Sequence, residues 1–205
     1  MKRIGVVTEG ESEVKGLPEI FPALEKRVGV QLLRPIRSAV DPLSPLPVLT
    51  KGLRTGIQLS LARNAQLVVV LLDRENSETS AAARAADIER RLRDEVDDAV
   101  RVVIKDRTFE NWLIACPEAF AKQRSRYSHS ERIRRAACPN KADRCADPCE
   151  LINSAMAKGR YDKTADAPKI LKFSNLDSMA ANSRSFRRFL AVLGDPKYVS
   201  GSKRP

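Results

Sequence analysis

The feature that most constrains the fold is the apolar run at residues 65–72. Its last six residues are Leu67-Val68-Val69-Val70-Leu71-Leu72, and the run ends abruptly at Asp73-Arg74-Glu75. A strand without polar alternation is typical of a central parallel strand that is covered on both faces. A chain with such a strand needs helices on both sides of its sheet. The run therefore predicts an α/β fold in which a mostly parallel sheet is flanked by helices.

The rest of the first half supplies the expected alternation of strands and helices. Short β-branched runs predict further strands at residues 4–7, 30–36 and 100–104. Apolar residues at helical spacing predict helices over residues 14–28, 48–63 and 80–96, with another beginning at residues 109–115. Pro18 and Pro22 leave the start of the first helix open. Right-handed crossovers between these strands would place all of their carboxyl ends along one edge.

The pattern changes after residue 116. Alternation gives way to a basic stretch, a cysteine-containing loop and short helices near residues 151–158 and 185–193. We therefore predict an α/β core at residues 1–116, an α-rich C-terminal extension packed on it at residues 117–198, and a flexible tail at residues 199–205.

The charge balance favours a polyanionic partner. Thirty-seven Lys and Arg residues outnumber 26 Asp and Glu residues, which gives a formal net charge of +11. Basic surfaces gain affinity for nucleic acid because phosphate contacts release counterions, although such a surface can also serve only solubility. A basic run at residues 122–135 could follow a phosphate backbone or could be a solvated helix face. Its candidate nucleic-acid contacts are Arg124, Arg126, Arg132, Arg134 and Arg135.

No export signal or membrane span is expected. The apolar run near the N-terminus stops at Thr8-Glu9, and the run at residues 67–72 is too short to cross a bilayer. A cytoplasmic location without a membrane partner follows as an expectation. The four cysteines would then be reduced thiols.

A zinc site is a weaker alternative for these cysteines. Cys138, Cys145 and Cys149 fall within twelve residues, and Cys116 or His129 could supply a fourth ligand. The spacing is not that of a standard zinc knuckle, however, and small buried or loop thiols explain it equally well.

Carboxylates follow three of the predicted strands. Glu9, Glu11 and Glu13 come after the first strand, Asp73 and Glu75 after the central strand, and Glu110 after the fourth. If the first strand lies beside the central one, these groups converge and repel one another. Mg²⁺ prefers such hard oxygen ligands, and the single histidine cannot form a zinc cluster of the usual kind. Some of these acids, especially Glu11 and Glu13 beside Ser12, could instead be solvated first-turn residues of a helix.

These segments resemble a known family. The segment Thr8-Glu9-Gly10-Glu11-Ser12-Glu13 resembles the glutamate-glycine motif that opens TOPRIM domains, and more closely its OLD-family nuclease variant, which has a further glutamate four positions on. Asp73-Arg74-Glu75 resembles the paired-aspartate motif, with Glu75 where an aspartate is usual. Phe109-Glu110-Asn111-Trp112 is similar to the glutamate segment after the fourth strand of the OLD-type branch.

The later part of the chain extends this resemblance to roughly residues 4–193. Tyr161-Asp162-Lys163 and the segment at residues 184–190 resemble an uncharacterised family of compact bacterial TOPRIM-like proteins, often encoded beside an ATPase in phage-defence loci.

The resemblance implies a TOPRIM-like fold and metal-dependent phosphodiester chemistry on DNA or RNA. Glu9 would be the general acid or base, and Asp73 and Glu75 would hold Mg²⁺ or Mn²⁺. Glu13 and Glu110 would serve a second metal ion. Lys163 would stabilise transition-state charge, although a surface lysine is the simpler interpretation in a chain this rich in Lys and Arg. The competing hypothesis is a non-catalytic TOPRIM-like adaptor that binds nucleic acid or a partner protein.

Overall fold

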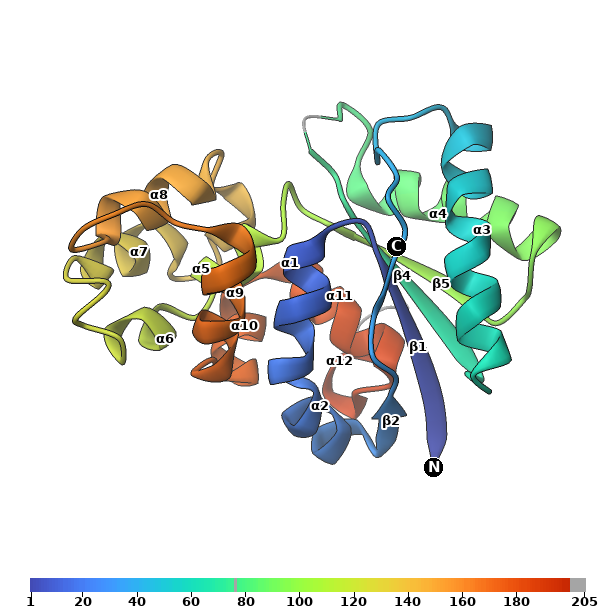
Figure 1. The fold of residues 1–205 in the computed structure, drawn as a ribbon, viewed down its shortest axis with the longest axis horizontal. Coiled ribbons are helices and arrows are strands. Elements are labelled where there is room, and N and C mark those ends of the chain that lie inside the picture. Colours follow the sequence, from blue (N-terminus) through green and yellow to red (C-terminus); the bar gives the residue numbers. More distant parts are fainter. Residues whose placement is uncertain (76, 200–205) are drawn as a thin grey trace.

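The protein folds around one parallel sheet (Figure 1). The computed structural model describes residues 1–75 and 77–199. The strand order is β2-β1-β4-β5, a further short strand β3 also pairs with β1, and every pairing within the described residues is parallel. The strands are β1 (Lys2–Thr8), β2 (Val30–Leu32), β3 (Ile36–Arg37), β4 (Leu67–Asp73) and β5 (Val100–Lys105). The predicted α/β class is confirmed, and the first strand does lie beside the central one.

The helices account for most of the remaining chain. Between the strands lie α1 (Glu11–Gly16), the 3₁₀ turn η1 (Leu17–Glu19), α2 (Phe21–Val28), α3 (Leu46–Ala62) and α4 (Ala81–Glu95). After the sheet come α5 (Glu110–Ile114), α6 (Pro117–Ala121), α7 (Ser130–Ala137), η2 (Ala142–Arg144), α8 (Pro148–Ala155), α9 (Lys163–Lys172), α10 (Leu176–Asn182), α11 (Arg184–Leu193) and α12 (Pro196–Val199). None of the helices within residues 1–75 and 77–199 combines the length and apolar character that crossing a membrane requires.

Helices cover both faces of the central strand, as its uninterrupted apolar sequence predicts. Val68, Val70 and Leu72 of β4 belong to one buried cluster with residues of α3 and α4. Val69 and Leu71 belong to a second buried cluster with residues of α2, α5 and α11. Figure 1 shows α3 and α4 on one side of the strands, with α6, α7 and α8 in a lobe far from α3.

The C-terminal part is α-rich and shares its core with the sheet. Helix α9 packs against α1, and α11 packs against β5. The Trp112 ring of α5 lies 5.1 Å from the Phe186 ring and 5.3 Å from the Phe189 ring of α11. Aromatic burial thus continues across the predicted boundary at residue 116. The predicted tail lies outside the described residues, except for Val199 at the end of α12.

Prolines divide two elements that the sequence pattern predicts as continuous. The expected helix at residues 14–28 is split into α1, η1 and α2, with Pro18 and Pro22 at the starts of the later pieces. The expected strand at residues 30–36 is split into β2 and β3 on either side of Arg34-Pro35. Proline has no backbone N–H to donate, so it favours the first turn of a helix and interrupts a ladder of strand hydrogen bonds.

Candidate metal and phosphoryl-transfer site

A cavity of about 250 Å³ opens at the carboxyl ends of β1 and β4. All five acids to which the sequence analysis gave a part in metal-dependent chemistry line this cavity, together with the predicted Lys163. Glu9 follows β1, Asp73 ends β4 and Glu75 follows it, while Glu13 lies in α1 and Glu110 begins α5. The parallel topology therefore brings these carboxylates to one edge of the sheet, because all of its strands end there.

Three of these carboxylates form the centre of the site, and we call Glu9, Glu13 and Asp73 the acid cluster. Each offers an oxygen, and the three oxygens lie within 4.8 Å of one another. The backbone N–H of Asp73 donates a hydrogen bond to Glu9 Oε1. Ser12 Oγ donates to Glu13 Oε2 at 2.9 Å. These bonds fix two of the three carboxylates before any ligand is present.

A buried lysine, which the sequence analysis missed, lies among the three acids. Lys105 Nζ is 2.9 Å from Asp73 Oδ1 and 3.6 Å from Glu9 Oε1, and it donates a short hydrogen bond to Glu13 Oε1. Its side chain has 0% exposed surface. The residue ends β5 directly opposite Asp73 in the strand register. The sequence contains one signal for this residue. Lys105 directly follows the apolar residues 102–104, just as Asp73 directly follows the apolar residues of β4.

Burial and charge set the proton affinities of the acid cluster. Burial raises the pKa of Glu9, against the opposing effect of Lys105. Burial raises the pKa of Asp73 well above its usual range, again against Lys105 and with added repulsion from Glu9 and Glu13. For Glu13, burial also favours the neutral acid, but the Lys105 ammonium prevails and the pKa is lowered. Burial disfavours the charge on Lys105, yet the surrounding carboxylates raise its pKa. The cluster therefore pairs a firmly charged lysine with two carboxylates that hold protons more readily than usual.

The other predicted site residues lie around this centre. Glu110 is 1% exposed, and its Oε1 lies 3.4 Å from Nζ of the half-exposed Lys163 at the start of α9. Glu75 adopts a left-handed backbone with φ of 52°, and its N–H donates to the Arg107 carbonyl at 3.0 Å. Glu11 lies at the rim, where it pairs with Lys15 at 3.2 Å, as expected for a first-turn residue of a helix.

The donor set fits a hard divalent cation. Six carboxylates and Lys163 line the cavity, and the buried Lys105 contacts three of these carboxylates, so a net negative charge remains when all are ionised. Asp73 Oδ1 and Glu110 Oε1 are buried and have ion-pair neighbours, but no donor among the described residues makes a hydrogen bond to them in suitable geometry. Oxygen ligands of this kind suit Mg²⁺ or Mn²⁺. Lys105 supplies part of the positive charge that the sequence analysis attributed to metal alone.

The basic run at residues 122–135 is partly used for internal contacts. Arg126 Nη2 lies 2.5 Å from the buried Asp166, Arg134 pairs with Glu118 and Glu131, and Arg132 donates to the Ser154 carbonyl. Arg124 and Arg135 are exposed, and neither side chain has a hydrogen bond or ion pair within residues 1–75 and 77–199. None of the five predicted arginines lines the acidic cavity.

The cysteines do not assemble a metal site. All four are free thiols; Cys116 is buried, and Cys138, Cys145 and Cys149 are partly buried. Within the described part of the chain, the acid cluster is the only group of three or more Cys, His, Asp or Glu residues whose ligand atoms converge. The interpretation of the cysteines as small packed thiols accounts for these positions.

Comparison with known proteins places the chain in a family. No curated protein and no solved structure matches it. One family model, described as "Domain of unknown function (DUF4276)", matches residues 8–194 and so spans the sheet, the acidic cavity and the C-terminal helices. The chain therefore belongs to the DUF4276 family.

Proposed function

We propose that the protein is a Mg²⁺- or Mn²⁺-dependent nuclease or nuclease subunit that acts on DNA or RNA phosphodiesters. The observation that carries this proposal is the convergence of Glu9, Glu13, Asp73, Glu75 and Glu110 on one cavity at the carboxyl ends of parallel strands. Ligands of α/β sheets gather at these ends. A divalent cation held there would polarise a phosphate and lower the pKa of an attacking water.

The side chains of the cavity have distinct parts in this chemistry. Asp73, Glu13 and Glu75 would hold the cation, and Glu110 lines the same cavity beside Lys163. Glu9 is suited to moving a proton, because burial raises its pKa toward the range in which a carboxyl can both accept and release one. Lys163 is exposed enough to reach a phosphate and would stabilise negative charge on it.

One observation favours a second candidate, a non-catalytic adaptor that binds nucleic acid or a partner protein. Lys105 already neutralises part of the acid cluster from within. An internal ammonium can replace a metal ion as the counter-charge, and the cluster would then only stabilise the fold. Glu75 also favours the adaptor, because its side chain is longer than that of the aspartate usual at this position of the TOPRIM motif.

Metal-dependent cleavage separates the two candidates. Purified protein would be incubated with plasmid, single-stranded DNA and RNA in Mg²⁺, in Mn²⁺ and in EDTA, with and without an ATPase encoded beside it. We expect cleavage only with metal, and a loss of several orders of magnitude in Asp73→Ala, which removes a metal ligand but leaves the apolar part of β4 intact. The matched control is Asp94→Ala, an exposed aspartate of α4.

The outcome of the same assay decides for or against the nuclease. Equal cleavage by wild type and Asp73→Ala, together with no Mg²⁺-dependent rise in melting temperature, would refute the nuclease proposal and favour the adaptor. A role in cytoplasmic phage defence beside an ATPase is the biological setting that we propose, and it rests on the family resemblance alone.

A further inference from the structure

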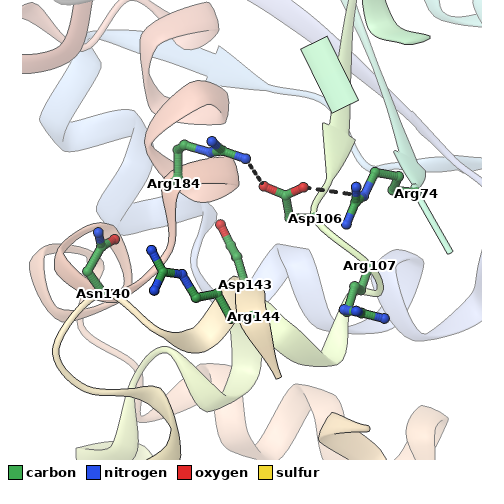
Figure 2. A pocket seen from close by; sticks show the side chains of 7 residues that line it. All are labelled: Arg74, Asp106, Arg107, Asn140, Asp143, Arg144 and Arg184. Carbon is green, nitrogen blue, oxygen red and sulfur yellow. Dashed lines mark hydrogen bonds and ion pairs between the residues drawn. The ribbon is translucent and has the colours of Figure 1, made fainter. Parts of the chain in front are cut away.

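A second polar cavity, of about 380 Å³, lies beside the acidic one. We call it the arginine pocket because four arginines line it with two aspartates and one asparagine: Arg74, Arg107, Arg144, Arg184, Asp106, Asp143 and Asn140 (Figure 2). Residues 73, 74 and 75 line the two cavities alternately, with Asp73 and Glu75 on the acidic one and Arg74 on the arginine pocket. The two cavities therefore share the end of β4.

Two of the four arginines are already paired. Figure 2 shows Asp106 between Arg184 and Arg74. Arg184 Nη2 donates to Asp106 Oδ2 at 2.7 Å, and Arg74 Nε lies 3.4 Å from Asp106 Oδ1. Arg74 Nε is buried, and no described acceptor completes a hydrogen bond with it. One carboxylate therefore serves two guanidinium groups and leaves them only partly neutralised.

The other two arginines have no hydrogen-bond or ion-pair partner among the described residues. Within residues 1–75 and 77–199, no hydrogen bond or ion pair engages the side chain of Arg107 or Arg144. Arg107 is held in a left-handed backbone conformation with φ of 75°, which is uncommon for a residue other than glycine. Such conformations persist where the surrounding structure enforces them, and they concentrate at ligand sites.

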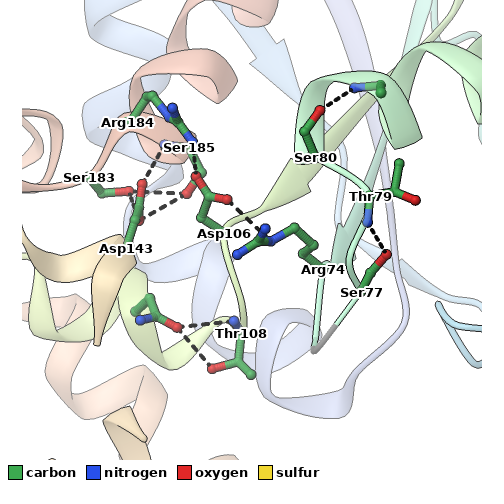
Figure 3. Close-up of polar contacts among 12 residues, drawn as sticks. Arg74, Ser77, Thr79, Ser80, Asp106, Thr108, Asp143, Ser183, Arg184 and Ser185 are labelled. Carbon is green, nitrogen blue, oxygen red and sulfur yellow. Dashed lines mark hydrogen bonds and ion pairs between the residues drawn. The ribbon is translucent and has the colours of Figure 1, made fainter. Parts of the chain in front are cut away.

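Partly buried hydrogen bonds hold the segments of the pocket in fixed positions (Figure 3). Asn111 receives hydrogen bonds from Thr108 N and Oγ1 in the loop after β5, and its Nδ2 donates to the carbonyls of Ala142, the first residue of η2, and Cys145, which follows η2. Asp143 of η2 accepts from Ser183 Oγ at 2.7 Å and from Ser185 N at 2.8 Å at the start of α11. The arginines therefore extend from a scaffold that is organised before a ligand binds.

The Asp143 bonds also explain why this aspartate forms no ion pair with an arginine among the described residues. Its oxygens are directed to the first turn of α11, where carboxylates are favoured by the exposed backbone N–H groups. Four guanidinium groups against two carboxylates leave the pocket with two net positive charges. Guanidinium groups bind phosphate oxygens with paired, charge-assisted hydrogen bonds.

We propose that the arginine pocket binds a terminal phosphate, the phosphomonoester of a nucleotide or of a nucleic-acid strand end. A phosphomonoester carries roughly 1.5 to 2 negative charges at neutral pH, which matches the excess charge of the pocket, whereas a backbone phosphodiester carries only one. Phosphate binding there does not depend on the metal chemistry. The assignment to a strand end rests on the proposed nuclease function.

An adjoining cavity has room for the group that carries this phosphate. It has a volume of about 590 Å³ and shares Asp106 and Arg184 with the arginine pocket. Much of its wall is apolar, formed by alanines of α4 and by Val102 and Ile104 of β5. A charged pocket beside a larger apolar one suits a nucleotide, whose phosphate and nucleoside need these two environments.

Binding of short strands in EDTA tests this proposal without any cleavage. Three tetranucleotides of one sequence would be compared at fixed ionic strength: one with a 5′-phosphate, one with a 3′-phosphate and one with neither. We expect wild type to bind a phosphorylated strand about tenfold or more tightly than the unphosphorylated one, and Arg107→Gln/Arg144→Gln to lose this preference. The control Lys51→Gln/Arg63→Gln removes the same charge from exposed positions on α3 and its end, and should keep the preference.

The results distinguish the sources of the phosphate and separate this proposal from the nuclease. Competition by a nucleoside monophosphate as strong as that by the phosphorylated strand would identify a free nucleotide, and much weaker competition would identify a strand end. Equal affinity of wild type for all three strands, or a preference that survives in the Arg107→Gln/Arg144→Gln variant, would overturn the proposal. A preference for a phosphorylated strand in a wild-type protein that cleaves nothing with Mg²⁺ or Mn²⁺ would refute the nuclease alone.

Discussion

Among single residues, Lys105 has the largest influence on the acid cluster. The acids themselves could be predicted from the sequence, because polar residues that directly follow apolar parallel strands must meet at one edge of the sheet. Lys105 could not, because a lysine after a strand is usually solvated and only the pairing of β5 with β4 shows that it is enclosed. Its contacts with Asp73 and Glu13 depend on strand order, which the pattern of apolar residues does not encode.

Replacing Lys105 with methionine should destabilise the protein strongly at neutral pH. The change keeps most of the side-chain volume but leaves three carboxylates buried without their internal cation, and breaking a buried ion pair in this way costs about 3–5 kcal/mol. The measurement is the free energy of unfolding from urea titration. We expect Mg²⁺ to restore part of the loss if the acid cluster binds metal.

The control for this change is Lys15→Met, because Lys15 forms only an exposed pair with Glu11. It should alter the free energy of unfolding by less than about 1 kcal/mol. A Lys105→Met protein as stable as wild type in EDTA would show that Lys105 does not neutralise the cluster.

Replacing Asp73 with asparagine should make stability less dependent on pH. Because the folded-state pKa of Asp73 is raised, this residue favours folding below the pKa of an unfolded aspartate, about 3.9, and loses that contribution as pH rises through the folded-state pKa. In EDTA, Asp73→Asn should therefore melt at a higher temperature than wild type at neutral pH. The difference should shrink as the pH falls to about 4 and below.

Melting curves recorded across this pH range, with Asp94→Asn as the control, provide the measurement. A gain that is equally large at acid and neutral pH would show that charge on Asp73 is not its cause. With Mg²⁺ at neutral pH the difference in melting temperature should shrink or reverse, because only wild type keeps the Asp73 carboxylate that would bind the proposed metal ion.

Among the elements, long apolar patterns were predictable and short polar helices were not. Helices α3 and α4 lie within one or two residues of their predicted bounds. Helix α9 has the sequence Lys163-Thr-Ala-Asp-Ala-Pro-Lys-Ile-Leu-Lys, with an internal Pro168 and few apolar residues, so its helical character depends on the Asp162 cap and on packing against α1. Lys163 could be named from the resemblance, but its position facing Glu110 required this packing.

Helix α3 approaches β1 closely because glycines, which have no side chain, lie where the two elements meet. A Cβ added to Gly5 of β1 would lie 2.7 Å from Ser60 Cβ of α3. Gly5→Ala should therefore lower the free energy of unfolding by about 1–3 kcal/mol through overpacking. Urea titration measures this loss directly.

A compensating change tests the cause of this destabilisation. Removing the opposing side chain in Gly5→Ala/Ser60→Gly should recover part of the stability, although glycine within a helix itself costs about 1 kcal/mol. Strictly additive effects of the two substitutions would mean that the contact between β1 and α3 is not responsible.

For the whole molecule, the distribution of charge matters more than its total. The net charge of +11 predicted a polyanionic partner, but not where that partner would bind. The arginine pocket combines residues that follow β4 and β5 with residues in or near η2 and α11. They are up to 110 positions apart in the sequence, so no local sequence pattern predicts the pocket. The aromatic core around Trp112 likewise joins the sheet to the C-terminal extension that the sequence pattern predicted to pack on it.

Binding to nucleic acid should weaken steeply with salt. Each phosphate neutralised on a duplex contributes about 0.9 to the slope of log affinity against log salt concentration. Arg124→Gln/Arg135→Gln removes two exposed and unpaired guanidinium groups from the basic run, and should reduce this slope by about 1 to 2. Fluorescence anisotropy of a labelled duplex at several salt concentrations gives the slope.

The variant Lys51→Gln/Arg63→Gln carries the same charge change and should leave this slope unaltered. Wild-type affinity that does not change between low and physiological salt would point to a partner other than nucleic acid.

If the proposed metal ion binds, the lysine within the acid cluster also governs how quickly that ion can enter. Because the Lys105 ammonium lies among Glu9, Glu13 and Asp73 before any ion arrives, loading of these carboxylates is an ion exchange and not the filling of an open cage. A side chain without exposed surface must release its contacts before an incoming ion gains them. Uptake of Mn²⁺ at the cluster is then limited by the movement of this arm, and its rate levels off at high Mn²⁺ concentration where diffusion-limited capture would keep rising.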